Sequence, residues 1–125
     1  MPVRSLNSSV LRWPNRQDVD RAVRRWAASE SRRHPGVRRI GYFGSYARGD
    51  WGVGSDLELV AVVAEADEPF QTRAVSCDLD DLPVSADLLV FREDEWQQTQ
   101  EQGSRFSRTM DREAVWVLEV GTCGT

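Results

Sequence analysis

The chain has 125 residues, of which 40% are hydrophobic and 29% are charged; these values exclude a disordered or collagen-like chain and predict one domain. Its 16 basic residues are all arginine, so P-loop and Schiff-base lysines are excluded, and two cysteines (Cys77, Cys123) with one histidine (His34) argue against zinc clusters and Cys–His catalysis. No apolar run has the length of a membrane span or a signal-peptide core, so we expect a cytoplasmic protein without membrane contact.

Charge is distributed unevenly along the chain, whose net charge is −4. Residues 1–40 hold ten arginines against three acids, whereas residues 41–125 hold six arginines against 17 acids. A basic N-terminal third can face an acidic partner or nucleic acid. The isoelectric point near 5.0 argues against nucleic acid and favours a solvated helix face that is partly paired with the acidic remainder.

The first elements in chain order are a tail, a helix and a strand. Residues 1–14 are expected to be an irregular tail. Asn15, with Asp18 three residues later, is typical of a helix start, and the apolar residues that follow recur at helical spacing. His34 lies at the expected helix end, so we interpret it as a cap rather than a ligand. The segment 37–43 is rich in β-branched and aromatic residues and predicts a strand.

The remaining elements complete a small α+β (mixed α/β) domain over residues 15–120, followed by a C-terminal tail, 121–125. We expect a mixed sheet of about four strands flanked by helices on one side. The predicted elements are tight turns in the glycine-rich residues 44–54, a strand at 55–64, a helix or strand piece around Phe70–Cys77, a turn at Asp80, Asp81 and Pro83, a strand at 83–91, helical spacing over 93–110 and a strand at 114–120.

Two carboxylates stand at the start of the second predicted strand. Because side chains alternate along a strand, Asp56 and Glu58 point to one face, with Cβ atoms about 6.5–7 Å apart. Such a pair suits a hard cation such as Mg²⁺, which removes the repulsion between the two charges. Taken alone, the pair is explained more simply as the acidic solvent face of a half-buried strand.

A glycine and a serine follow the first predicted strand directly. Gly44 allows the backbone to approach a phosphate closely, Ser45 adds a hydroxyl group, and the Arg48 guanidinium can bind phosphate oxygens. Taken alone, this motif is explained more simply as a structural turn between a strand and a helix.

Together the motifs read Gly-Ser, ten residues, Asp, one residue, Glu. This spacing resembles the signature of the polymerase-β-type nucleotidyltransferase superfamily, and YFGSYARGDWGVGSDLELV looks like the minimal nucleotidyltransferases, including their antitoxin members. The resemblance covers about residues 37–120. It implies a small nucleotidyltransferase fold with a third carboxylate in a later strand, where Asp87 matches. The competing carboxylates, in a turn-like stretch, are Asp78, Asp80 and Asp81.

The resemblance implies metal-dependent transfer of a nucleoside monophosphate from an NTP, with ATP as the expected donor. Two Mg²⁺ or Mn²⁺ ions would be held by Asp56, Glu58 and Asp87, and Asp87 would also accept the proton of the attacking hydroxyl. The residues implied to bind the nucleotide are Gly44, Ser45, Arg48 and Ser55. For Ser55, a plain role in the turn is the favoured alternative.

The acceptor is the open part of this interpretation. Minimal nucleotidyltransferases often act as antitoxins by adding AMP to a helical HEPN-type toxin, and we expect such a partner. A small-molecule acceptor of the antibiotic type is the alternative. A catalytically inactive protein that binds a nucleotide or a partner also stays open, because Glu58 stands where most minimal members have Asp, although aminoglycoside nucleotidyltransferases have Glu there. The sequence also leaves open a homodimer.

Trp51 lies in the glycine-rich loop beside the expected phosphate site. Stacking on a base or on a partner is one interpretation of this residue. A role as an anchor that packs the loop against the domain is the favoured one.

Overall fold

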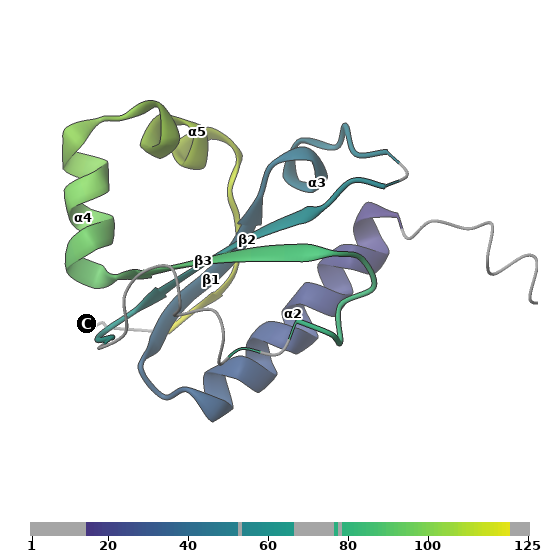
Figure 1. The fold of residues 1–125 in the computed structure, drawn as a ribbon, viewed down its shortest axis with the longest axis horizontal. Coiled ribbons are helices and arrows are strands. Elements are labelled where there is room, and N and C mark those ends of the chain that lie inside the picture. Colours follow the sequence, from purple (N-terminus) through teal and green to yellow (C-terminus); the bar gives the residue numbers. More distant parts are fainter. Residues whose placement is uncertain (1–14, 53, 67–76, 78, 121–125) are drawn as a thin grey trace, which may run out of the picture.

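The computed structural model describes residues 15–52, 54–66, 77 and 79–120. The two expected tails, and the segment expected around Phe70–Cys77 except Cys77 itself, lie outside this range. With the labels of Figure 1, the elements in chain order are α2 (Arg16–Arg33), β1 (Val37–Phe43), α3 (Ser45–Arg48), β2 (Leu57–Val63), β3 (Ala86–Arg92), α4 (Glu93–Gln102), α5 (Arg105–Glu113) and β4 (Val115–Glu119).

The four strands form one mixed sheet in the order β3-β2-β1-β4. Strand β1 lies in the centre and is antiparallel to both β2 and β4. Strand β2 is parallel to β3, and Glu58 pairs in register with Asp87. The expected α+β class and the mixed sheet of about four strands are therefore confirmed.

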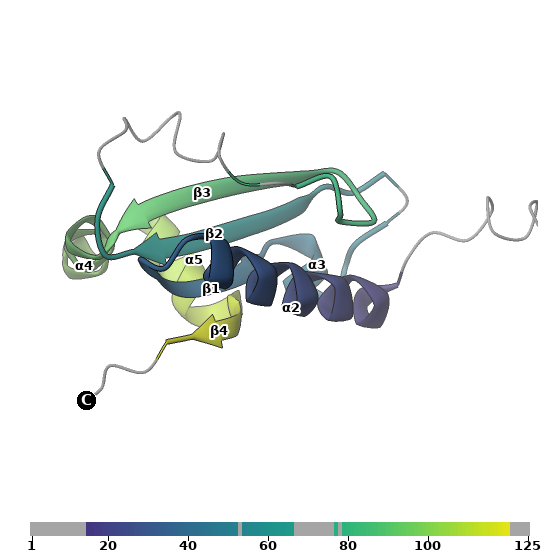
Figure 2. The same ribbon diagram turned by 90° about the horizontal axis from the view of Figure 1, so that it is seen from below.

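Helices cover both faces of the sheet, which corrects the expectation of helices on one side. The larger core joins α2 to the β2 residues Leu57, Leu59 and Ala61. A second cluster joins α4 and α5 to the alternate residues Val60 and Val62. Figures 1 and 2 show α2 on one side of the sheet, away from α4 and α5. The continuous apolar run in β2 is the physical reason, because a strand with apolar residues on both faces must be covered twice.

The helix α2 begins and ends where the sequence predicts. Asn15 and Asp18 form a reciprocal capping box, in which the Asp18 backbone N–H donates to the Asn15 side chain at 2.8 Å and the Asn15 N–H donates to Asp18 at 3.2 Å. At the other end, the His34 backbone N–H donates to the Glu30 carbonyl at 2.8 Å. His34 is thus the C-cap residue.

The helical spacing over residues 93–110 corresponds to two helices rather than one. Gly103 adopts a left-handed conformation with φ of 63° and ends α4, and the Ser104 side chain then caps α5 by accepting from Ser107 N–H at 3.2 Å. The break turns the chain so that α5 packs over the sheet and leads into β4. Among the described residues, no helix has the combined length and apolar character needed to cross a bilayer.

Candidate active site

Three carboxylates lie near one another at the N-terminal ends of the strands β2 and β3. Glu58 and Asp87 are neighbours across the parallel strands β2 and β3, and Asp56 immediately precedes β2. By strand alternation, Asp56 and Glu58 share the face of Val60 and Val62, which is the face that α4 and α5 cover further along. Glu58 is half-buried there, whereas Asp56 and Asp87 are exposed.

Glu58 is surrounded by negative charge. Burial raises the pKa of its carboxyl, Arg48 lowers the pKa, and the carboxylates of Glu113, Asp87 and Asp56 raise it further, with a net upward shift. A divalent cation between these groups would offset the cost of burying the Glu58 charge and would reduce the repulsion among the carboxylates. Since every candidate donor is a carboxylate oxygen, the set fits a hard ion such as Mg²⁺ or Mn²⁺.

The backbone at the end of β1 lies directly against this carboxylate group. Gly44 has φ of 83° and ψ of −152°, a conformation that is essentially restricted to glycine. A Cβ atom at this position would collide with Oε2 of Glu58. The backbone conformation therefore requires Gly44, and a side chain at this position would force the Glu58 carboxylate to shift.

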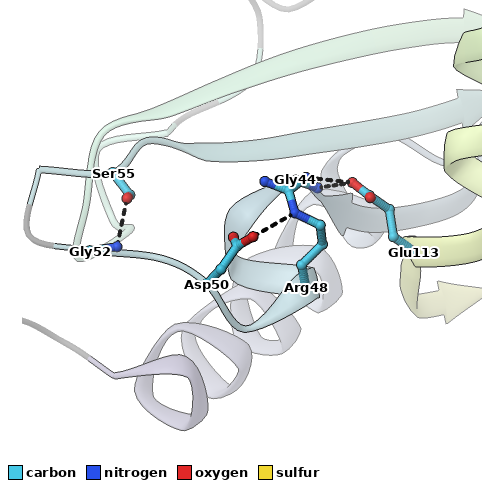
Figure 3. Close-up of polar contacts among 6 residues, drawn as sticks. All are labelled: Gly44, Arg48, Asp50, Gly52, Ser55 and Glu113. Atoms are coloured by element: carbon cyan, nitrogen blue, oxygen red, sulfur yellow. Dashed lines mark hydrogen bonds and ion pairs between the residues drawn. The ribbon is translucent and has the colours of Figure 1, made fainter.

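Glu113, at the end of α5, contacts two groups that the sequence assigns to phosphate binding. The Gly44 N–H donates to its Oε2 at 2.7 Å, and Arg48 Nη1 lies 3.3 Å from the same oxygen. Figure 3 shows the Glu113 carboxylate pointing at Gly44 and Arg48, while Arg48 also donates from Nε to Asp50 at 3.0 Å. The Glu113 side chain is only 13% exposed.

The sequence interpretation missed Glu113 because the residue lies outside the recognised motifs. The signal that could have found Glu113 is the pairing of the last strand, β4, with β1. Tyr42 pairs with Val115 in the antiparallel register of β1 and β4, and continuing that register places Glu113 opposite Gly44. An expectation that β4 pairs with β1 would therefore have brought Glu113 to the site.

The loop between α3 and β2 is held by its own contacts. The Ser55 hydroxyl accepts from the Gly52 N–H at 2.8 Å and the Ser55 N–H donates to the Gly52 carbonyl, so Ser55 closes a turn (Figure 3). The Trp51 ring stacks on Tyr46 with centroids 5.6 Å apart, which agrees with an anchoring role. Ser45 is the first residue of α3 and lies beside Gly44.

Asp87 pairs in register with Glu58 and acts on its charge, whereas Asp80 and Asp81 lie in the turn that precedes β3. Asp78 lies outside the described residues. A cleft of about 490 Å³ opens beside the carboxylate group, and both Glu58 and Asp87 line it. The cleft gives a substrate access to these carboxylates.

Comparison with known proteins adds a family match and a shared fold. The nucleotidyltransferase domain model matches residues 24–114. A proposed nucleotidyltransferase from Sulfolobus solfataricus has a TM-score of 0.59 at 15% identity, with 83% of each chain covered. Two toxin–antitoxin structures, one with AMP-PNP and one of an MntA–HpeT mutant, have TM-scores of 0.49 and 0.48 at 18% identity, covering 78% of this chain and 73% of theirs. No curated protein matches the chain significantly.

Proposed function

The chain belongs to the nucleotidyltransferase domain family, and we propose that it transfers a nucleoside monophosphate from ATP to a hydroxyl group of a protein acceptor. The observation that carries the proposal is the register pair of Glu58 and Asp87 beside Gly44, at the start of β2. This pairing brings together, at the N-terminal ends of β2 and β3, the motif carboxylates Asp56 and Glu58 and the carboxylate of Asp87, which lies far from them in the sequence. The use of ATP favours a cytoplasmic location.

We assign Asp56, Glu58 and Asp87 to the binding of Mg²⁺ or Mn²⁺. Bound divalent ions would supply charge stabilisation to the attacking and leaving oxygens of an in-line displacement. Glu58 offers a half-buried carboxylate that lies against Gly44, and the exposed Asp56 and Asp87 can adjust around it. Asp87 faces the cleft, where it can accept the proton of the attacking hydroxyl.

The groups that we assign to the triphosphate are the Gly44 N–H, the Ser45 hydroxyl and the Arg48 guanidinium. Glu113 now accepts from the Gly44 N–H and lies beside Arg48, so its carboxylate oxygen takes the place that a phosphate oxygen would take. Nucleotide binding on these groups would have to displace Glu113. Arg48 is exposed and can follow the incoming phosphate.

The acceptor that we propose is a HEPN-type toxin, with this chain as its antitoxin. Support comes from the resemblance to the minimal nucleotidyltransferases and from the charge of α2. All six arginines of α2 are exposed, which offers a basic surface to an acidic partner: Arg16, Arg21, Arg24, Arg25, Arg32 and Arg33. Because Arg24 also binds Asp20 at 2.7 Å, Arg25 is the cleaner position for testing the surface.

The test incubates the protein with each labelled NTP and Mg²⁺, with and without the product of the neighbouring reading frame, for which we expect a small helical protein. We expect covalent label on the partner, loss of transfer in Asp56→Asn with the complex intact, and a weaker, salt-dependent complex in Arg25→Glu. Rapid transfer to a small hydroxylated compound without the partner would favour the small-molecule reaction. An intact complex without transfer under any NTP and metal would instead indicate an inactive binding protein.

A further inference from the structure

A second cavity lies at the end of the sheet opposite the carboxylate group. It has a volume of about 270 Å³ and is lined by the C-terminal end of α2, the start of β1 and the end of β2, with Glu30, His34 and Cys77 among its lining residues. Val63, which lines this cavity, lies about 17 Å along β2 from Glu58, and the cavity is on the α2 face of the sheet, opposite the face of Asp56 and Glu58. The cavity is therefore a separate location.

Glu30 is a buried carboxylate in this otherwise largely apolar cavity. Its side chain is only 3% exposed, and its Oε2 accepts from Arg33 Nη1 at 3.1 Å. The other oxygen, Oε1, faces Nε2 of His34 at 3.4 Å, within ion-pair distance, and neither of these buried atoms makes a hydrogen bond with the described residues. Because a buried polar atom without a hydrogen bond costs stability, a ligand that binds both atoms would stabilise this end of α2.

The three side chains present three metal donors close together. One oxygen of Glu30, one ring nitrogen of His34 and the sulfur of Cys77 all lie within 4.8 Å of one another. Zinc bonds of about 2.0–2.1 Å to nitrogen and oxygen, at tetrahedral angles, set an N–O separation of about 3.3 Å. The observed 3.4 Å between His34 and Glu30 matches that separation, and the Cys77 sulfur, within 4.8 Å of both atoms, would have to move closer by up to about 1.4 Å for a zinc–sulfur bond of about 2.3 Å.

We propose that Glu30, His34 and Cys77 bind one Zn²⁺ ion, with water in the fourth position. The proposal goes beyond the nucleotidyl transfer and does not depend on it. Glu30 and His34 are four residues apart, so one face of α2 supplies two ligands, and Arg33 holds the second Glu30 oxygen in place. A thiolate and an imidazole select zinc over Mg²⁺, which prefers oxygen ligands.

Bound zinc would tie the C-terminal end of α2 to Cys77, in the segment that leads to β3. The counting of cysteine and histidine in the sequence argued against such a site because it left out a buried carboxylate as the third ligand. His34 can be both cap and ligand, since its backbone N–H caps α2 and its ring nitrogen faces Glu30.

The test uses the full chain, freed of metal with a chelator and titrated with Co²⁺ as a spectroscopic substitute for zinc. With excess Mg²⁺ present to occupy the carboxylates of the candidate active site, we expect one equivalent of Co²⁺ to give the absorption bands of tetrahedral cobalt and a thiolate-to-cobalt charge-transfer band, and Zn²⁺ to abolish both. Cys77→Ser should remove the charge-transfer band, and Cys77→Ser and His34→Ala should each weaken Zn²⁺ binding about tenfold or more.

Two matched controls separate this site from the rest of the chain. Cys123→Ser, at the other cysteine, should keep the charge-transfer band, and Asp56→Asn should keep it while losing nucleotidyl transfer. Circular dichroism checks that Cys77→Ser and His34→Ala are folded, and Glu30→Gln provides a variant of the same shape that should also lose the ion. A charge-transfer band that survives in Cys77→Ser, or folded wild type that shows no charge-transfer band with Co²⁺, would overturn the proposal.

Discussion

The backbone conformation of Gly44 predicts a costly glycine substitution that also shifts the Glu58 carboxylate. In Gly44→Ala the backbone must hold φ of 83° and ψ of −152° with a side chain, which costs about 1–3 kcal/mol. The new methyl group would also overlap Oε2 of Glu58 and displace that carboxylate. Gly49→Ala is the matched control, because Gly49 also has a positive φ, of 88°, but has open space around it, so only about 1–2 kcal/mol is expected.

A double-mutant cycle isolates the collision from the backbone strain. Glu58→Ala removes the carboxylate that the methyl group meets, so Gly44→Ala should cost less in that background, with a coupling free energy of about 1 kcal/mol. Glu58→Ala should cost little stability by itself, because it removes a half-buried charge surrounded by other carboxylates. Urea unfolding at pH 7 of the two single variants, the double variant and the Gly49→Ala control measures each quantity.

The activity of the same variants gives a second readout. A displacement of Glu58 by about 1 Å should lower nucleotidyl transfer about 100-fold in Gly44→Ala, whereas Gly49→Ala should retain most activity. Additive effects of Gly44→Ala and Glu58→Ala on the free energy of unfolding would refute the contact. The contact would also be refuted if Gly44→Ala and Gly49→Ala lowered the free energy of unfolding equally and retained equal activity.

Three further substitutions test the carboxylates and the buried tyrosine. Asp56→Asn, at an exposed position, should change the free energy of unfolding by about 0.5 kcal/mol or less while abolishing transfer; a large loss of stability would contradict its assignment to metal binding. Glu113→Gln should tighten binding of Mg-ATP several-fold in calorimetry, since it removes a charge that competes with phosphate, and weaker binding would instead make Glu113 part of the binding set. Tyr42→Phe removes a 2.7 Å hydrogen bond to Asp20 and should cost about 1 kcal/mol at pH 7. Burial and Asp20 raise the pKa of Tyr42, so its contribution is fully present below the ordinary tyrosine pKa of about 10 and is lost as pH rises through the raised value. The urea midpoint of Tyr42→Phe should therefore fall less between pH 9 and pH 11 than that of the wild-type protein. Equal falls in the two proteins would contradict this.

Local signals in the sequence predicted the elements that depend on local chemistry. The strand 37–43 matches β1 in both bounds, because β-branched and aromatic residues are concentrated there between Gly36 and Gly44. The start of α2 follows from Asn15 and Asp18, whose side chains satisfy the first backbone N–H groups without help from the rest of the fold.

Features that depend on contacts between distant segments were harder to predict. The break at Gly103 divides one periodic segment into two helices, and the apolar spacing continues across it because both helices pack on the same face of the sheet. The apolar run in β2 indicates that both faces of the sheet are covered, but the sequence interpretation placed the helices on one side. Asp87 was found through the resemblance, because the parallel pairing of β2 and β3 is not visible in either strand alone.

The register of the last strand, β4, places Glu113 against the Gly44 N–H at the end of β1. Val115 pairs with Tyr42, and this register sets Glu113 beside the Gly44 N–H. Glu113 is the last residue of α5, two residues before β4, so a change in the register of β4 would shift the end of α5 and carry Glu113 away from Gly44 and Arg48. The C-terminal strand therefore determines which acceptor the Gly44 N–H finds when no phosphate is bound. A carboxylate held there satisfies the N–H and adds negative charge beside Glu58, so the arrangement that stabilises the loop also raises the need for a cation among the carboxylates.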